Sequence, residues 1–521
     1  MNLALLLQKH TTLYRERLAV RLGDDEQSYG ELFERACRLA NGLRALGLLP
    51  GDRVATLGGN DFRSVEEIMG LVVGGFVRVS LHSLNSWDVH EYMIQHAGAR
   101  ALLVQQKYYE QYESEIRNLG LDAVIVRGGR DHSEIDYEAL VANAPAGFPE
   151  VQIDLDAPIQ LQFSSGTTGR PKAIVHTHRS WMGVTNENLL MLPPITPTDR
   201  YLAAGPLTHA ANTLLFALFA RGASVEVMPA FSPQAFVDLV RSRECTISIL
   251  VPTMIRVISS SPEFRPDDLS NLRILLYAGS PISGETLRAA SALFGPILLQ
   301  TYGQSEGLPY TVLTADDHVR AGEQQEHSAL LGSAGRPTPN SVVKILDDEG
   351  KSVPPGTVGE VAVWTPGRMH SVWKNPEATA KRITHDGFVL TNDLGFLDDA
   401  GYLFLRDRRD DMIISGGFNI WPAEIESALE AHRDIDQALV FGIADEKWGE
   451  TPVAIVVPRA GSALTEDEVV AWVRDRLGPV KKPGHVIFRA EPLPHNAIGK
   501  ISRRAVRSLY FDDTVAGFQG A

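Results

Sequence analysis

The stretch from Phe163 to Lys172, F-S-S-G-T-T-G-R-P-K, gathers residue types that bind phosphate oxygens. Glycines let the backbone turn its N–H groups inward, hydroxyl groups add short donors, and the lysine adds a full positive charge. Apolar runs lie on both sides, so we expect a loop between two strands. It is not a Walker A loop, because G-x-x-x-x-G-K-[ST] does not match and the residues that follow are typical of a strand. The stretch therefore predicts a polyphosphate site, although a plain Ser/Thr/Gly surface loop has the same composition.

A second candidate segment is G-Q-S-E-G at residues 303–307, which follows the strand-like residues 297–302. It satisfies the G-x-S-x-G pattern of α/β-hydrolases, in which a helix must follow the serine nucleophile at once. The chain continues instead with L-P-Y-T-V-L, which contains a proline and β-forming residues and predicts a poor helix. A serine hydrolase would also leave the Ser/Thr/Gly loop without a role, so it is the weaker interpretation.

The elements that position these segments alternate between strand and helix patterns. Strands are expected at residues 53–57, 77–81, 101–105, 123–126, 201–204, 224–228, 246–251 and 273–276, and helices at 30–46, 64–75, 180–192 and 213–220. Strands separated by helices imply crossover connections and a mainly parallel sheet. Ligands bind such open sheets beyond the carboxyl ends of the strands, which is where residues 277–281 and 303–307 fall. His82, His90 and His96 lack the spacing of metal ligands, and we expect them to be surface or packing residues.

The remainder of the chain predicts two smaller regions. Strands at residues 342–346 and 359–364 indicate a β-rich region after Gly335. Strands at 438–442 and 453–458, a helix that begins at Pro422 and another at 466–477 indicate a small mixed domain at the end. With 521 residues the chain exceeds one ordinary hydrophobic core, so two or more domains are expected.

Composition narrows the class of partner. The net charge of −15 has no basic stripe or arm beside it, which argues against nucleic acid as the main partner. The two cysteines, Cys37 and Cys245, lie in apolar patterns and are expected in the core of a reduced, cytoplasmic protein. No run of residues approaches a membrane-spanning length, and the N-terminal L-A-L-L-L is too short for a signal sequence.

Several segments together resemble the adenylate-forming superfamily, which contains acyl-CoA synthetases, peptide-synthetase adenylation domains and luciferases. S-S-G-T-T-G-R-P-K is similar to its phosphate loop, and T-Y-G-Q-S-E to its Y-G-x-[ST]-E motif. The run from Asp407 to Glu426 resembles D-R-x-x-D-x-I…G-G-x-N-I-x-P-x-E-I-E, and the run from Pro494 to Arg503 resembles P-x-T-x-x-G-K-I-x-R. Two departures are Asn392, where the family has the glycine of T-G-D, and Asn496, where it has threonine.

The resemblance implies a fold and a division of the chain. The expected class is α/β, with a large N-terminal domain of mainly parallel βα subdomains and a small β-barrel-like region, followed by a small, mobile α+β domain. The N-terminal domain would span residues 1–409 and bind ATP and the acid. The C-terminal domain would span residues 410–521, with Asp410 as the hinge.

The resemblance also assigns site residues. ATP phosphates would be bound by Ser164, Ser165, Gly166, Thr167, Thr168, Gly169 and Lys172; adenine, ribose and α-phosphate by Gly279, Ser280, Pro281, Tyr302, Gly303, Gln304, Ser305, Asp393 and Arg408. Mg²⁺ would be held by Glu306 and Thr168, because oxygen ligands suit a hard cation that bridges phosphates. The acid pocket would comprise His209, Asn212, Tyr277, Gly279, Gln300 and Gln304. CoA would meet Gly416, Gly417, Trp448, Lys481 and Lys482. Lys500, with Glu306, Ser305 and His209, would carry the catalysis.

These assignments predict an ATP-dependent ligase that forms an acyl-AMP from a small carboxylic acid, fatty or aromatic, and transfers the acyl group to CoA. Within the family, an enzyme that loads a separate carrier protein is the alternative. Outside it, the serine hydrolase and a non-catalytic nucleotide-binding protein stay open. The oligomeric state, including a homodimer, is left open as well.

Overall fold

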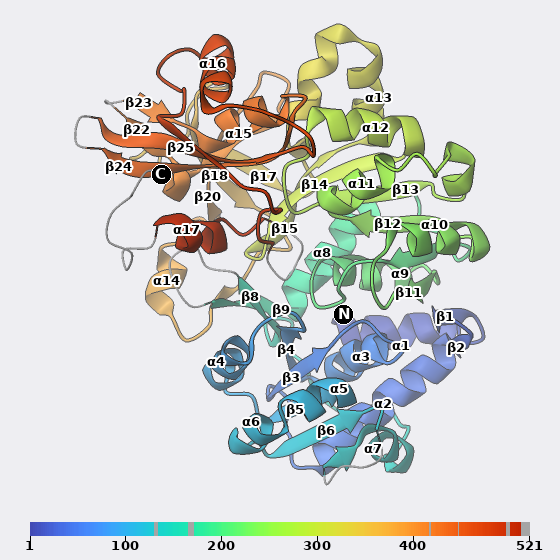
Figure 1. Cartoon of the computed structure of the whole chain (residues 1–521). Helices are drawn as coiled ribbons and strands as arrows, with labels where there is room; N and C mark the ends of the chain where they lie inside the picture. Colours follow the sequence, from blue (N-terminus) through green and yellow to red (C-terminus); the bar gives the residue numbers. More distant parts are fainter. Residues whose placement is uncertain (130–133, 165–170, 416–417, 446–447, 496–500, 512–521) are drawn as a thin grey trace. The chain divides into compact units, whose positions relative to one another are not determined.

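The computed structural model describes residues 1–129, 134–164, 171–415, 418–445, 448–495 and 501–511. The chain forms two compact units (Figure 1). Unit 1 contains Met1–Ser280, Ala289–Val343 and Val363–Leu390, and unit 2 contains Pro281–Arg288, Lys344–Ala362 and Thr391–Ala521. The domain boundary expected at residues 409 and 410 stays a prediction.

One sheet of unit 1 is parallel in its centre and antiparallel at its ends. Its order is β16-β15-β14-β13-β12-β10-β11-β1-β2, and the strands from β14 to β1 run parallel. Strands β2, β15 and β16 are added antiparallel. The bounds are β1 Leu18–Leu22, β2 Asp25–Ser28, β10 Arg200–Ala203, β11 Ser224–Val227, β12 Ile247–Leu250, β13 Ile274–Ala278, β14 Leu298–Gln304, β15 Gly307–Leu313 and β16 Arg336–Pro337.

A second sheet of unit 1 has the order β19-β9-β8-β4-β3-β5-β6-β7. Its strands from β8 to β7 run parallel, whereas β9 and β19 are antiparallel to their neighbours. The bounds are β3 Arg53–Gly58, β4 Val77–His82, β5 Ala101–Gln105, β6 Ala123–Arg127, β7 Ile135–Asp136, β8 Pro158–Ser164, β9 Lys172–Thr177 and β19 Ser371–Val372. The mainly parallel sheets expected from the alternating pattern are confirmed.

The helices of unit 1 connect these strands and begin at residues that suit a helix start. Ser28 and Glu31 form a capping box at the start of α2, and Thr177 and Ser180 form one at the start of α8. The bounds are α1 Leu3–Leu13, α2 Tyr29–Ala45, α3 Ser64–Gly74, α4 Trp87–Ala97, α5 Gln106–Gln111, α6 Glu113–Asn118, α7 Tyr137–Asn143, α8 His178–Met191, η1 Ala210–Leu214, α9 Leu215–Phe219, α10 Pro233–Ser242, α11 Pro252–Ser259, η2 Pro266–Leu269, α13 Ala315–Glu323, η3 Gln325–Gly332 and α14 Pro376–Ala380. Helix α12, Gly284–Phe294, crosses the boundary between the two units.

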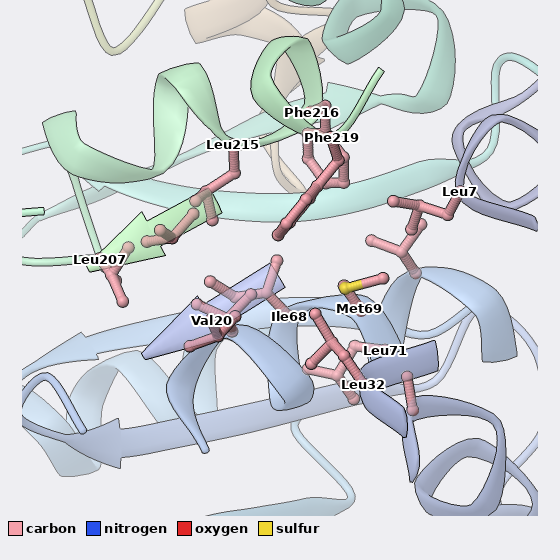
Figure 2. Packing of buried hydrophobic residues seen from close by; sticks show 14 of the residues in the cluster. Leu7, Val20, Leu32, Ile68, Met69, Leu71, Leu207, Leu215, Phe216 and Phe219 are labelled. Carbon is pink, nitrogen blue, oxygen red and sulfur yellow. The ribbon is translucent and has the colours of Figure 1, made fainter. Parts of the chain in front are cut away.

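The core of unit 1 joins the faces of both sheets. Phe216 and Phe219 of the segment after β10 point toward the layer that holds Ile68 and Met69 of α3 (Figure 2). Burying such side chains removes apolar surface from water, which is the main favourable term in folding. Cys37 and Cys245 are both buried, as expected.

Unit 2 contains two further sheets, and the strands β17, β18 and β20 continue into unit 1 at their ends. One sheet has the order β17-β18-β20-β21, and the other has β23-β22-β25-β24 with β26 beside β25. The bounds are β17 Val342–Leu346, β18 Gly359–Trp364, β20 Val389–Leu397, β21 Leu403–Arg408, η4 Arg409–Asp411, β22 Ile413–Ser415, β23 Phe418–Ile420, α15 Pro422–Glu430, β24 Ile435–Asp445, β25 Gly449–Pro458, α16 Glu466–Leu477, β26 His485–Phe488 and α17 Arg503–Phe511. The α/β class, with a large N-terminal part and a smaller C-terminal part, is confirmed. Within the described ranges, none of the helices has the length and apolar character needed to span a membrane.

Gly335 allows a first prediction, about stability. It has φ of +85°, and a Cβ atom there would overlap the backbone of Val312 in β15. We expect Gly335→Ala to lower the free energy of unfolding by about 3 kcal/mol, because steric overlap and left-handed strain add. Gly332→Ala is the matched control, since its Cβ would meet nothing within 4 Å, and should change stability by less than about 0.5 kcal/mol. Thermal and denaturant unfolding measure both, and equal effects of the two substitutions would contradict the prediction.

Candidate functional site

Strands β8 and β9 form a hairpin whose tip holds the predicted phosphate loop. Ser164, the last residue of β8, is the register partner of Lys172, the first residue of β9. The Lys172 side chain is exposed at this tip. The expected loop between two strands is thereby confirmed at its two ends. The predicted ligands Ser165, Gly166, Thr167, Thr168 and Gly169 lie outside the described residues.

A second hairpin, β14–β15, holds the motif around Ser305 and Glu306 at its turn. Gln304 pairs with Gly307, so Ser305 and Glu306 are the two turn residues. The strand β15 follows at once, and no helix begins at Gly307. An α/β-hydrolase elbow needs a helix there to present its serine. The structure therefore gives no support to the serine hydrolase.

The turn of the second hairpin is fixed by contacts from distant parts of unit 1. The ring Nε2–H of His176 in β9 donates to the Ser305 carbonyl over 2.8 Å, and the Met369 N–H donates to the Glu306 carbonyl over 2.7 Å. Burial lowers the pKa of His176, so the ring is neutral at pH 7. The Glu306 carboxylate is only 12% exposed, and Arg382 lies within ion-pair distance of it, with Nη2 3.9 Å from Oε1. Since His176 lies on β9, its bond to Ser305 also joins the two hairpins.

The strands β13 and β14 end beside each other at the carboxyl edge of their sheet. Gly279, which follows β13, has φ of +100°, a conformation that glycine adopts without strain. On β14 the Tyr302 ring packs edge-on against Tyr310, with 5.4 Å between the ring centroids. Gly303 is tightly enclosed, because a Cβ there would come within 3.1 Å of Leu308. Ser280 and Gln304 lie at the same edge, whereas Pro281 belongs to unit 2.

Two predicted pocket residues, Tyr277 and Gln300, are register partners on β13 and β14. The Tyr277 hydroxyl is fully buried and lies 3.0 Å from Gln300 Oε1 and 2.8 Å from His318 Nε2. His318 donates its Nδ1–H to the Thr314 carbonyl over 2.7 Å, and burial lowers its pKa. Its Nε2 is therefore an acceptor for the tyrosine hydroxyl. The hydroxyl has a single proton, so once it donates to His318 it can only accept at Gln300, and the NH2 group rather than Oε1 of that amide would have to face it.

The two other pocket candidates, His209 and Asn212, follow β10. The His209 Nδ1 lies 3.0 Å from the Thr208 hydroxyl, and its ring centroid lies 5.2 Å from that of His82 on β4. Asn212 is 2% exposed in the short helix η1, and its Oδ1 has no hydrogen-bond partner. The expected helix at 213–220 is in fact the 3₁₀ turn η1 followed by the short helix α9.

The ribose residues carried over by resemblance lie in unit 2 and pair with each other. Asp393 of β20 is the register partner of Arg408 of β21, and Arg408 Nε lies 3.6 Å from Asp393 Oδ1. Asn392, which stands where the family has glycine, has φ of +62°. Asparagine tolerates this left-handed region better than other residues that have a side chain. The substitution therefore keeps the backbone turn that places Asp393.

The residues on either side of the segment that carries Lys500 pair with each other within unit 2. Residues 496–500 lie outside the described residues, but His495 and Ile501 form an antiparallel bridge across them. The Arg503 guanidinium then donates to Glu426 of α15 over 2.6 Å and lies 3.5 Å from Asp411. Asp410 lies in the turn η4, between β21 and β22. The start of α17 is thus tied to the segment that contains the expected hinge.

The residues predicted to meet CoA are spread over unit 2. Gly416 and Gly417 lie outside the described residues. Trp448 is half exposed, and its backbone N–H donates to Asp445 Oδ1 over 2.9 Å. The Lys481 ammonium donates to both carboxylate oxygens of Glu424, each over 2.7 Å. Lys481 would have to leave this ion pair to bind a CoA phosphate, whereas Lys482 at the next position is exposed.

Three residues that position the site were missed in the sequence: His176, His318 and Arg382. His176 stands at the end of an apolar run, and its partner Ser305 lies 129 positions away. The local pattern around each of them holds no signal for such a contact.

Parallel sheets with two hairpin tips at their carboxyl edges, one rich in Ser, Thr and Gly and one bearing Glu306, define a nucleotide-binding α/β enzyme. Residues 7–373 match the family model described as AMP-binding enzyme, and residues 424–500 match the AMP-binding enzyme C-terminal domain. The chain therefore belongs to the family of AMP-binding enzymes.

Relatives and solved structures agree with this. Feruloyl-CoA synthase from Amycolatopsis sp is 34% identical over 496 residues, which are 94% of this chain and 96% of the relative. 2-Succinylbenzoate–CoA ligase from Bacillus licheniformis is 31% identical over 95% of this chain and 98% of its own length. The crystal structure of ATP-bound MatB from Rhodopseudomonas palustris has a TM-score of 0.87 and 28% identity, covering 98% of this chain and 99% of that one.

Proposed function

We propose that the chain is an AMP-forming ligase that joins a carboxylic acid to CoA. The observation that carries the proposal is the bond from His176 on β9 to the Ser305 carbonyl at the β14–β15 turn, 2.8 Å long. It fixes the hairpin of the phosphate loop against the hairpin that presents Glu306. The family membership and the CoA ligases among the relatives support the same reaction.

The first half-reaction brings two anions together. The acid's carboxylate attacks the α-phosphorus of ATP, and pyrophosphate leaves with the electrons of the broken P–O bond. Repulsion between the reactants is strong in a site that excludes water, so positive charge must offset it. We assign this role to Lys172 beside the phosphate loop and to Lys500.

The residues at the Glu306 turn fit a magnesium ion. Mg²⁺ is commonly held by one or two carboxylates together with substrate phosphates, so a cluster of acidic residues is not required. In the described part of the chain, no group of three or more His, Cys, Asp or Glu could hold a metal. Glu306 would hold the ion with Thr168; within the described ranges its carboxylate forms a single, long ion pair, 3.9 Å from Arg382. When bound, the ion would neutralise charge on the phosphates.

The second half-reaction needs a thiol at the acyl carbon. The CoA sulfur attacks the mixed anhydride, a thioester forms, and AMP leaves. Because Lys500 would occupy this place in the first step, we propose that the small domain rotates about Asp410 between the steps. Asp393 and Arg408 would hold the ribose throughout.

Acid-dependent exchange of labelled pyrophosphate into ATP tests the proposal. We expect exchange with at least one member of a panel of aromatic, alicyclic and aliphatic acids, and thioester formation once CoA is added. Exchange without thioester, restored by an acyl carrier protein, would favour the carrier-loading alternative. No exchange with any acid would leave a non-catalytic nucleotide-binding protein and contradict the proposal.

A further inference from the structure

A row of polar side chains lies along one face of β4. Arg78, Ser80 and His82 alternate with Val77, Val79 and Leu81, so the two sets point to opposite faces of the sheet. The apolar side chains pack in one hydrophobic core. The polar residues are almost fully buried: Arg78 is 7% exposed, Ser80 3% and His82 4%. We call Arg78, Ser80 and His82 the β4 polar row.

Each member of the β4 polar row has a polar atom that finds no hydrogen-bond partner among the residues the structure describes. These atoms are Arg78 Nε, Ser80 Oγ and His82 Nε2. The His82 Nδ1 accepts the Leu84 N–H over 3.2 Å, so the unpartnered Nε2 carries the proton of the neutral ring. Burial lowers the pKa of His82 to about 4, which keeps the ring neutral at pH 7. The row therefore presents donors.

Arg78 is a buried cation with little to bind. Its two terminal nitrogens lie 3.4 Å from the Leu207 carbonyl, and within the described ranges no carboxylate comes within ion-pair distance of it. Glu67 is the acidic residue whose charge acts on Arg78, but its carboxylate forms an ion pair with Arg127 over 2.6 Å. Burial lowers the pKa of Arg78 to about 10, and the guanidinium still carries its charge at pH 7.

A pocket beside Arg78 holds further buried polar side chains. A small pocket with about 10 Å³ of free volume is lined by Arg78, Gln160, Asn212 and Trp181 together with apolar residues of α3, β8 and α9, so its side chains would have to shift to admit a carboxylate. Gln160 is the register partner of Arg78 on β8. Among the described residues, neither the Trp181 Nε1–H, a donor, nor Asn212 Oδ1, an acceptor, has a hydrogen-bond partner, and both atoms are buried. The apolar side of this pocket, Ile68 and Leu71 below Phe216, is drawn in Figure 2.

The β4 polar row begins at the expected acid site. The ring centroid of His82 lies 5.2 Å from that of His209, and Arg78 contacts Leu207 in the same loop. From His82 to Arg78 the row extends for roughly 13 Å, at about 3.3 Å per residue of a strand. For an acid whose reacting carboxylate lies near His209, the far end would have to follow this row to reach Arg78.

We propose that the β4 polar row binds the end of the acid remote from the reacting carboxylate, and that this end carries a second carboxylate. This rests on the proposed ligase function and names the substrate class. A carboxylate would accept from Arg78 and the Trp181 ring, and it would supply the counter-charge that the guanidinium lacks. A plain hydrocarbon end would leave these donors buried and unpaired.

Matched pairs of acids test the proposal: each dicarboxylic acid is compared with the monocarboxylic acid of the same chain length. We expect kcat/KM for acid-dependent pyrophosphate exchange to favour the dicarboxylic acid by 10-fold or more in at least one pair. Arg78→Met should reduce that ratio by a factor of 10 or more. Asn212→Asp places a carboxylate in the same pocket and should reduce the ratio too, which keeps the test valid if Arg78→Met does not fold.

The control is Val79→Ala, on the opposite face of the same strand. It should lower the melting temperature and leave the ratio unchanged. A wild-type enzyme that prefers the monocarboxylic acid in every pair would overturn the subsite but leave the ligase intact, and so would an Arg78→Met variant with an unaltered ratio. Absence of exchange with every acid would overturn both.

Discussion

Replacing Lys500 by alanine is expected to lower acid-dependent pyrophosphate exchange by a factor on the order of 10² to 10³, the cost of removing one charge-stabilising donor in other enzymes. The loss should fall on kcat, because the ammonium acts on charge that moves as the α-phosphorus is attacked. Thioester formation from a supplied acyl-AMP and CoA should be retained, since the proposed mechanism uses Lys500 only in the first step. Single-turnover measurements of the two half-reactions separate these outcomes.

The contacts that flank residues 496–500 should survive this substitution. The bridge between His495 and Ile501 and the ion pairs of Arg503 do not involve the lysine side chain. Arg474→Ala is a matched control, because Arg474 is an exposed cation of the same unit that pairs with its neighbour Asp475 at 2.9 Å. It should leave both half-reactions unchanged. If Lys500→Ala slowed both half-reactions equally, the lysine would not be specific to the first.

Periodicity was enough to predict most elements of the fold. The strand expected at 101–105 and the helix expected at 466–477 occur with those bounds, and the strand expected at 53–57 extends one residue further. These segments have strong patterns and clear ends. The pattern did not predict that β14 continues to Gln304, because the pairing partner that extends it, β15, lies beyond the turn.

The contacts that build the site were harder to predict. Tyr277 meets His318 41 positions further on, and His176 meets Ser305 across 129 positions. Such pairs depend on the order of the strands in the two sheets, and that order cannot be predicted from the spacing of residues along the chain. Strand β4 shows the same limit: its alternation of apolar and polar residues is typical of a half-exposed strand, yet all six residues are buried since both faces of the sheet are covered.

Asn392 shows where a departure from a motif is explained only by the backbone. In the sequence it weakened the match to T-G-D. The structure gives it φ of +62°, so the position needs a left-handed conformation rather than a glycine as such. Asp393 pairs with Arg408, which the resemblance also assigns to the ribose, and the ribose role of both residues stays a prediction.

Glu306→Gln is expected to have the second large effect, a loss of pyrophosphate exchange on the order of 10²-fold at a fixed, low Mg²⁺ concentration, as for removal of one charge-stabilising group. The amide keeps the shape of the side chain but removes the charge that would hold the ion. The turn itself should not move, because it is held through backbone carbonyls by His176 and Met369. The melting temperature of the variant should therefore stay close to that of the wild type.

A magnesium titration separates a metal ligand from a partner of Arg382. If Glu306 holds the ion, the Mg²⁺ concentration for half-maximal exchange should rise in Glu306→Gln, and Arg382→Ala should not reproduce that rise. Glu377→Gln is the control, since Glu377 is an exposed carboxylate paired with Lys381 at 2.7 Å. A variant whose activity fell without any change in its Mg²⁺ dependence would show that the carboxylate acts on the 3.9 Å contact with Arg382 instead, and the metal site would have to be sought elsewhere.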